Sequence, residues 1–328
     1  RMFSLPVFLQ SFEPLIWAAR YTLLISVLGI GLGLVMPNFM TAALNVAPAH
    51  RRGAASGAMT TAIFTGQFLS PLLTGTYALE DLGEAHLLAD LRKIESKYSS
   101  VIADASGLKI GAMTTLATLE RSADVKKITP LITRTTLTLS NIRVRNVATV
   151  GGALAHGDPH MDLPPVLMAL GAVATVIGPK GERKIAIEEL FAGYYETVLE
   201  KNELISEVFV PAQGTKKGAY MKVTTGSADD WPALGVAAVV EADGKAIKNV
   251  CIVASAATDK ATRLKAAEAV INGKTATDDL LAKAGDAAVE ECEFIADVRG
   301  SVPYKRELMR VYVRRAVSAA LEGKDGVH

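Results

Sequence analysis

Charged side chains are spread very unevenly along this chain. Residues 1–78 hold only five of them, and all the others lie further along. Two uncharged runs, 21–49 and 53–79, each exceed the roughly 20 residues that a helix needs to cross a bilayer core. The pattern predicts a hairpin of two transmembrane helices within residues 1–80, with the basic link Arg51–Arg52 on the cytoplasmic side. A pair of buried helices in a soluble core is the alternative interpretation.

Beyond residue 80, the pattern is typical of a water-facing domain that mixes strands and helices. Segment 80–100 suits a linker and a short helix, and segment 108–122 predicts a strand and then a helix starting at Thr114 or Thr115. The other expected elements are a helical segment in 128–139, a hairpin in 172–191 with a Pro179–Glu182 turn, a strand in 202–211 that stops at Pro211, three strands within 218–257 with a turn at 242–245, and three helical segments near 261–271, 276–291 and 303–322. A sheet followed by helices predicts an α+β layer.

Two helix signals are specific enough to name residues. Asp162 precedes Leu-Pro-Pro and an apolar run, and an aspartate followed by proline in the first turn is a strong helix start. The helical segment near 303–322 is expected to present one broad apolar face, formed by Leu308, Val311, Val313, Val317 and Ala320.

The composition excludes several classes of function. Lys and Arg number 35 against 34 Asp and Glu, so the net charge is +1 and gives no basic footprint for nucleic acid. Half of the residues are hydrophobic, which is too many for a disordered protein. The two cysteines, Cys251 and Cys292, are too few for a disulfide framework, a four-cysteine zinc site or an iron–sulfur cluster within this chain.

A candidate binding motif, Thr-Val-Gly-Gly-Ala, runs from Thr149 to Ala153. Two adjacent glycines let the backbone approach a ligand closely and leave N–H groups free for a phosphate or a flavin ring. The spacing matches neither the dinucleotide fingerprint nor the P-loop, and an ordinary tight turn at Gly151–Gly152 is the other open interpretation.

Two histidines, His156 and His160, follow the glycine pair. On a helix, histidines four residues apart would share one face, as zinc ligands do. Gly157 and Pro159 interrupt a helix there, so metal binding is not expected. Asp162 is expected to cap its helix at minimum, and its side chain could also accept a hydrogen bond from a ligand.

The run from residue 142 to 172, IRVRNVATVGGALAHGDPHMDLPPVLMALGA, resembles the FAD-binding medium subunit of the molybdenum hydroxylases. That family includes the carbon monoxide dehydrogenase flavoprotein and the flavin domain of xanthine dehydrogenase. Other segments resemble it in the same order: LADLRKI, LKIGAMTTLATLERS, FAGYYETVL, NELISEVFVP and DWPALGVAAVV. The resemblance covers about residues 88–320.

The resemblance implies FAD as cofactor and a set of flavin contacts. The implied contacts are Thr149, Val150, Gly151, Gly152 and Ala153 of the motif, then Asp162, Ile205 and Lys222. Ala153 stands where the family commonly has Asn, Ser or Asp. The arginines that usually follow the lysine are replaced here by Thr224-Thr225-Gly226. No catalytic acid or base and no metal ligand is implied within this chain.

The fold that the resemblance implies is α+β. Its parts are the second subdomain of a PCMH-type FAD-binding domain and a C-terminal domain of sheet and helices, preceded by the transmembrane hairpin. The expected domains are transporter-like helices in 1–80, a junction in 81–87, the FAD-binding subdomain in 88–212, the flavoprotein C-terminal domain in 213–322 and a tail in 323–328.

The glycine-rich GG-x-[ST] segment that holds the FAD pyrophosphate in this family does not occur in residues 1–87. In its place, GLGLVMP, Arg52-Gly53 and ASG resemble two late helices of a major facilitator superfamily transporter. We therefore expect a fusion at about residues 79–88, either a real one or an artefact, and the initial Arg1 suggests a fragment. A transporter fragment joined to a soluble domain, including a non-functional chimera, is the alternative to the flavoprotein interpretation.

The function implied by the resemblance is oxidoreductase electron transfer. A molybdopterin-binding large subunit oxidises the substrate, a small subunit carries electrons through [2Fe–2S] clusters, and FAD on this chain passes them to an acceptor. The soluble part is cytoplasmic in the family, and the chain is expected at the membrane if residues 1–80 insert.

Overall fold

The computed structural model describes residues 98–227 and 229–323. The expected membrane hairpin and the junction after it lie outside these residues and stay predictions. No helix within the described ranges is long and apolar enough to cross a membrane.

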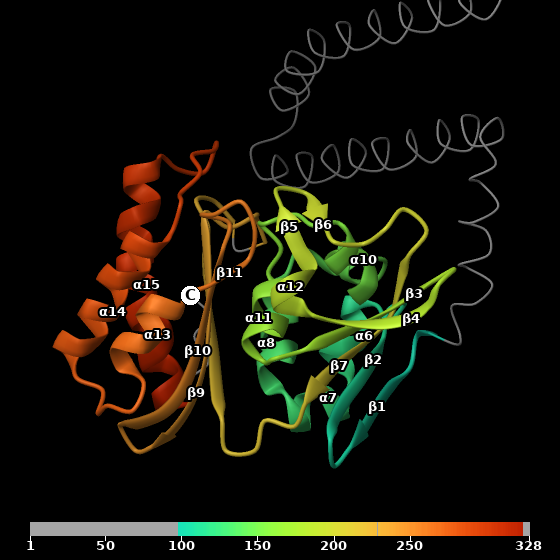
Figure 1. The fold of residues 1–328 in the computed structure, drawn as a ribbon, viewed down its shortest axis with the longest axis horizontal. Coiled ribbons are helices and arrows are strands. Elements are labelled where there is room, and N and C mark those ends of the chain that lie inside the picture. Colours follow the sequence, from blue (N-terminus) through green and yellow to red (C-terminus); the bar gives the residue numbers. More distant parts are fainter. Residues whose placement is uncertain (1–97, 228, 324–328) are drawn as a thin grey trace, which may run out of the picture. The chain divides into compact units, whose positions relative to one another are not determined.

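A five-stranded antiparallel sheet forms the first part, with strand order β1-β2-β7-β3-β4 (Figure 1). Its strands are β1 (Val101–Asp104), β2 (Gly107–Gly111), β3 (Val173–Gly178), β4 (Gly181–Ala186) and β7 (Leu204–Pro211). The predicted 172–191 hairpin is confirmed for 173–186, since β3 pairs with β4 from Val173↔Ala186 to Gly178↔Gly181, but residues 187–190 form a short helix instead. The strand expected to stop at Pro211 is β7.

Short helices pack on one face of this sheet. They are α6 (Leu116–Arg121), α7 (Ala123–Ile128), α8 (Pro130–Thr138), α9 (Ile142–Arg145), α10 (Val150–Ala155), α11 (Leu163–Ala169) and α12 (Ile187–Leu190). The predicted helix start at Thr115 is confirmed, because its hydroxyl accepts a hydrogen bond from the N–H of Thr118 at 3.2 Å. A small two-stranded sheet follows α12, formed by β5 (Phe191–Gly193) and β6 (Glu196–Thr197).

The second part is a four-stranded sheet with strand order β11-β10-β9-β8. Its strands are β8 (Lys217–Val223), β9 (Leu234–Asp243), β10 (Ala246–Ser255) and β11 (Thr262–Arg263), and its helices are α13 (Lys265–Ile271), α14 (Asp278–Glu291) and α15 (Val302–Glu322). The three strands and three helices predicted from the sequence are all present. Ala246 pairs with Asp243, so the predicted turn at 242–245 is also confirmed.

The β8–β11 sheet is covered on both faces (Figure 1). Helices α13 and α15 cover one face, with α14 packed against both of them, and α11 packs against β9 and β10 from the other side. Seven consecutive residues of β9, Leu234 to Val240, are therefore buried, which explains why their sequence is continuously apolar instead of alternating. This sheet is the common wall of two hydrophobic cores.

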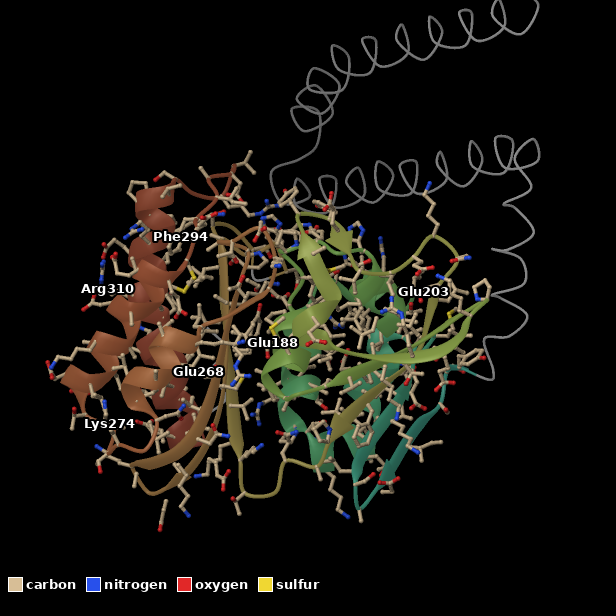
Figure 2. All side chains as sticks on the ribbon, viewed as in Figure 1. Glu188, Glu203, Glu268, Lys274, Phe294 and Arg310 are labelled. Atoms are coloured by element: carbon tan, nitrogen blue, oxygen red, sulfur yellow. The ribbon has the colours of Figure 1, made fainter. Side chains whose placement is uncertain are left out.

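Charged side chains also cross the boundary between the two parts. Arg263 on β11 donates to Glu268 of α13 at 2.9 Å and to Glu188 of α12 at 3.1 Å. Figure 2 labels the two carboxylates, Glu188 on the α12 side and Glu268 on the α13 side. Lys260 adds a hydrogen bond to the carbonyl of Phe191 at 3.2 Å. Apolar packing and ion pairs therefore hold the two parts together.

One detail of the predicted apolar face on α15 is wrong. Val313, Val317 and Ala320 are buried as expected, but Val311 is 38% exposed. The buried face instead includes Met309, four residues before Val313, and Ala316, three residues after it. Positions three and four apart share a helix face, whereas Val311 is two residues from Val313 and turns away.

We expect Gly285→Ala to lower the melting temperature of the chain. A Cβ at this position of α14 would overlap the carbonyl oxygen of Arg310 on α15. Overpacking of this kind costs about 1–3 kcal/mol, which exceeds the gain of about 1 kcal/mol from replacing glycine within a helix. Thermal unfolding followed by circular dichroism measures the effect. Lys283→Ala, at an exposed position of the same helix, is the control, and an unchanged or raised melting temperature in Gly285→Ala would contradict the packing argument.

Candidate functional site

Helix α10 begins at the Thr-Val-Gly-Gly motif. The hydroxyl of Thr149 accepts a hydrogen bond from the N–H of Gly152 at 3.1 Å and so caps the helix. The N–H groups of Val150 and Gly151 donate to the carbonyls of Thr114 (3.0 Å) and Ala112 (2.8 Å). The glycine pair is thus neither an isolated tight turn nor a loop with free N–H groups, because it forms the first turn of a short helix anchored beside β2.

The two glycines have different reasons to lack a side chain. A Cβ on Gly151 would lie 2.7 Å from the Cβ of Ala112, so this glycine is required by packing. Gly152 is exposed, and a Cβ there would approach only its own capping partner, the hydroxyl of Thr149, at 3.0 Å. Gly152 therefore leaves one bare stretch of backbone on the outer side of α10. A flat cofactor can approach such a surface closely.

Asp162 stands at the N-cap position of α11, but its side chain does not cap the helix. This corrects the expectation from the sequence. One carboxylate oxygen, Oδ1, accepts a hydrogen bond from the Tyr220 hydroxyl at 2.6 Å. The other oxygen, Oδ2, lies 2.9 Å from the Nζ of Lys222. The carboxylate is directed across the boundary to β8, and Pro164 and Pro165 of α11 need no cap because they have no N–H.

The Asp162–Lys222 pair is almost completely buried, with both side chains about 5% exposed. Burial raises the pKa of the Asp162 carboxyl above its usual value, although Lys222 and Tyr220 oppose the shift. Burial and the neighbouring Asp162 also raise the pKa of Tyr220 well above its usual value. Lys222 donates a further hydrogen bond to the carbonyl of Thr138 at 3.0 Å. Each charge therefore has polar partners, as a buried pair requires.

Tyr220 is the site residue that the sequence analysis did not single out. It lies two residues before Lys222 on β8, and side chains two apart on a strand point to the same face. Gly235 on β9 makes room for it, because a Cβ there would overlap the Tyr220 hydroxyl. The alternation of side chains along β8 places Tyr220 on the same face as Lys222. The sequence does not show that Asp162 lies opposite this face, so the alternation alone could not identify Tyr220 as a site residue.

Ile205 lies on β7, apart from the ion pair. The register between β3 and β7 shifts after Thr175↔Glu207, so that Val176 pairs with Ile205. This bulge turns Ile205 toward the buried Val176, and Ile205 packs partly buried against the first hydrophobic core. A regular strand would have placed it on the same face as Glu207.

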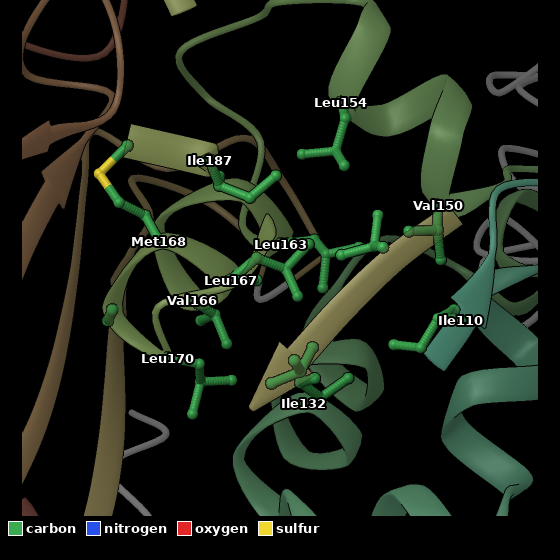
Figure 3. Close-up of a cluster of buried hydrophobic side chains, with 14 of the residues drawn as sticks. Ile110, Ile132, Val150, Leu154, Leu163, Val166, Leu167, Met168, Leu170 and Ile187 are labelled. Carbon is green, nitrogen blue, oxygen red and sulfur yellow. The ribbon is translucent and has the colours of Figure 1, made fainter. Parts of the chain in front are cut away.

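A shared core holds the pieces of the candidate site. Figure 3 shows Val150 and Leu154 of α10 directed into the same cluster as Leu163 and Leu167 of α11. The structure thus joins Asp162 and Lys222 directly and links them to the Thr149–Ala153 motif through packing. Ala153 itself is buried, with 5% exposure.

The residues present fit a flavin on the outer side of α10. Gly152 offers bare backbone there, and each Asp162 oxygen, which has one polar partner, retains a second acceptor lone pair. In the part of the chain that the structure describes, no three His, Cys, Asp or Glu side chains are placed to hold a metal ion. His156 and His160 do not share a helix, since α10 ends at Ala155.

Comparisons with known proteins agree with this arrangement. A FAD-binding domain of molybdopterin dehydrogenases matches residues 73–213, and the CO dehydrogenase flavoprotein C-terminal domain matches residues 219–320. The carbon monoxide dehydrogenase medium chain of Hydrogenophaga pseudoflava is 32% identical over 257 residues, which cover 78% of this chain and 87% of that one. The nicotine 6-hydroxylase medium subunit of Paenarthrobacter nicotinovorans is 32% identical over 215 residues, or 65% and 75% of the two chains.

A solved structure gives the same result for the fold. Carbon monoxide dehydrogenase from Hydrogenophaga pseudoflava, in a form that lacks the Mo-pyranopterin moiety of its molybdenum cofactor, matches with a TM-score of 0.68 and 33% identity. The match covers 70% of this chain and 80% of that chain. The fold and site therefore define a FAD-binding flavoprotein. More narrowly, the chain belongs to the FAD-binding medium-subunit family of the molybdenum hydroxylase-type dehydrogenases, and it is an oxidoreductase component.

We expect Lys222→Met to destabilise the chain by about 3–5 kcal/mol, because it leaves the buried Asp162 carboxylate without its cation. The double variant Asp162→Asn/Lys222→Met should recover much of this loss. Since protonation neutralises an acid whose folded-state pKa is raised, Lys222→Met should also lose less stability relative to wild type as the pH falls. Urea unfolding at several pH values measures all three effects.

The matched control is Lys265→Met. Lys265 pairs with Glu188 at 2.7 Å, but its side chain is 70% exposed, so its loss should cost at most about 1 kcal/mol. Equal losses in Lys222→Met and Lys265→Met would show that the buried pair has no special importance.

Proposed function

We propose that this chain holds the FAD of a molybdenum hydroxylase and passes electrons from [2Fe–2S] clusters on a partner to an external acceptor. The observation that supports it most strongly is that both flavoprotein domains match, in the family's order, over residues 73–213 and 219–320. The family's cofactor is FAD. The proposal adds the direction of electron flow and the two partners, a molybdopterin-binding large subunit and a [2Fe–2S] small subunit.

The number and state of the cysteines support placing the iron–sulfur clusters on a different subunit from the flavin. The chain has two cysteines in total, whereas a [2Fe–2S] cluster is held by four thiolates. Burial raises the pKa of Cys251 and of Cys292 to about 12, so both stay neutral thiols. These residues therefore cannot hold the clusters that feed the flavin, and we assign the clusters to a partner subunit.

The flavin supplies the redox chemistry when it is bound, and the residues of this chain bind and orient it. We assign the contacts to Thr149, Val150, Gly151, Gly152, Ala153, Asp162, Ile205 and Lys222. Within this set, Gly152 offers the bare backbone, Thr149 fixes the helix turn that carries it, and Gly151 anchors that turn against Ala112. Lys222 holds Asp162 in place from β8.

The substrate is not chosen by this chain in our proposal. The relatives above are medium subunits of a carbon monoxide dehydrogenase and a nicotine 6-hydroxylase, and this chain is 32% identical to each. Medium subunits of one type thus serve enzymes with very different substrates. We infer that the large subunit selects the substrate here as well.

Flavin retention by the purified full chain tests the binding site. After incubation with FAD and desalting, we expect a visible flavin band in the wild type. Gly152→Val should raise the Kd for FAD at least about tenfold, equivalent to about 1.4 kcal/mol, because its side chain covers the bare backbone. Ala155→Val, at another exposed position of α10, is the matched control and should bind like the wild type. A wild-type chain without flavin would contradict the proposed function and would indicate that the pyrophosphate-holding segment, which residues 1–87 do not contain, is indispensable.

Isolation of the chain from its source with its natural partners tests the electron-transfer role. The complex should contain molybdenum, iron and flavin, and its substrate should bleach the flavin band. Recovery of the chain alone, or with partners that contain neither metal, would contradict the proposed assembly.

A further inference from the structure

A buried cluster of ionisable side chains joins the loop between α10 and α11 to the C-terminal part. We call it the His160 cluster; its members are Asp158, His160, Asp297 and Lys305. Asp158 and His160 belong to the loop, Asp297 precedes α15 and Lys305 is in the first turns of α15. Their side chains are 3%, 7%, 17% and 1% exposed, respectively. None of them is among the flavin contacts assigned above.

Both ring nitrogens of His160 face a carboxylate. Nδ1 lies 2.8 Å from Oδ1 of Asp158, and Nε2 lies 2.9 Å from Oδ2 of Asp297. A neutral imidazole has one N–H donor only, and its bare nitrogen would repel the second carboxylate. The geometry therefore requires an imidazolium that donates from both nitrogens. With Lys305 the cluster then has two positive and two negative charges.

Other donors keep the two carboxylates charged. Asp158 accepts hydrogen bonds from the backbone N–H of His160 at 2.8 Å and from the Tyr195 hydroxyl at 2.7 Å. Burial opposes ionisation, but these bonds and the His160 ring lower the pKa of Asp158. Burial likewise opposes ionisation of Asp297, and bonds from His160 and Lys305 outweigh it and lower its pKa to about 2.

Lys305 attaches the same loop by a second route. Its Nζ lies 2.9 Å from Oδ2 of Asp297 and donates to the carbonyl of Ala256 at 2.9 Å. The N–H of Ala256 in turn donates to the carbonyl of Pro159 at 2.8 Å. Ala256 has φ +66°, a left-handed conformation that is unfavourable for alanine, and both of its backbone groups are engaged here. The loop is thus held by a backbone hydrogen bond at Pro159 and by the side-chain contacts of His160.

The geometry points to His160 as a positioning residue: its imidazolium ties the 157–161 loop to the C-terminal part and thereby holds Gly152 and Asp162 in the arrangement that binds the isoalloxazine of FAD. The inference rests on the proposed function for the identity of the ligand. The loop leads from the helix that carries Gly152 directly to Asp162, and both flank it within six residues. Release of His160 should therefore weaken FAD binding without removing any flavin contact.

The charge on His160 predicts a dependence on pH. The groups around the ring and its carboxylates are His156, whose Nε2 is 3.9 Å from Asp158; Tyr195 on Asp158; Arg299, 3.9 Å from Asp297; Lys305; and the edge of Trp231. Loss of one ring proton removes one of the two N–H donors. Loss of that proton should then lower the affinity for FAD.

The first experiment needs no flavin. Two-bond ¹H–¹⁵N correlation spectra of the full-length chain should show both ring nitrogens of His160 protonated at neutral pH. Hydrogen exchange should show protected amides at His160 and Met161, and this protection should be lost in His160→Gln. A singly protonated His160, or unchanged protection in the variant, would overturn the inference whether or not the chain binds FAD.

The second experiment measures the Kd for FAD across the pH range. His160→Gln should raise the Kd about tenfold at neutral pH and make it less dependent on pH, because glutamine carries no charge and cannot donate to both carboxylates. His156→Gln is the matched control, since this side chain is half-exposed and its Nε2 lies 3.9 Å from Asp158, beyond hydrogen-bond distance. Asp297→Asn preserves the shape and should give the same loss as His160→Gln, with little further loss in the double variant.

Three outcomes are distinguishable. No FAD binding by the wild type contradicts the proposed function, and the spectra and exchange data then decide alone whether His160 holds the loop. Wild-type binding with equal Kd and pH profile in His160→Gln and His156→Gln contradicts the positioning role only. A tenfold loss confined to His160→Gln and Asp297→Asn supports both.

Discussion

The buried ion pair between Asp162 and Lys222 is the interaction on which the candidate site depends. It joins the start of α11 to β8. These elements are far apart in the sequence: Asp162 and its hydrogen-bond partner Tyr220 are separated by 58 residues. Two buried charges are costly to remove from water, and the pair is tolerable only because Tyr220 and the carbonyl of Thr138 supply further hydrogen bonds. The first turn of α11 is thereby fixed against the C-terminal sheet.

Every second residue of the segment 158–162 makes a comparable attachment. Asp158 binds Tyr195 and the His160 ring, His160 reaches Asp297, and Asp162 reaches Lys222. The carbonyl of Pro159 adds a bond to the strained Ala256. A short loop between two helices is ordinarily among the more mobile parts of a fold, but this one is held by polar contacts that are mostly buried. The proposed flavin site is therefore completed only when the two parts of the protein pack together.

This construction agrees with the role of a medium subunit. The flavin supplies the chemistry, so the protein needs a rigid cradle more than it needs an acid or a base. Gly152 supplies bare backbone, and the Asp162–Lys222 pair is kept away from solvent. The electron donors and the substrate centre belong to partners in the proposed assembly, which is consistent with two neutral cysteines in this chain.

Local patterns in the sequence determined the elements: the alternating strands, the turn at 242–245, the cap at Thr115 and the start of α11 all follow from periodicity and turn chemistry over a few residues. The Thr149–Gly152 motif was also visible, although its helical conformation was not. Only the tertiary structure decided that Asp162 pairs with Lys222 instead of capping its helix, and that Val311 faces outward. The same holds for the bond from His160 to Asp297, which spans 137 residues. Such contacts depend on which faces of the helices and sheets pack against one another, and the spacing of residues along the chain does not determine this packing.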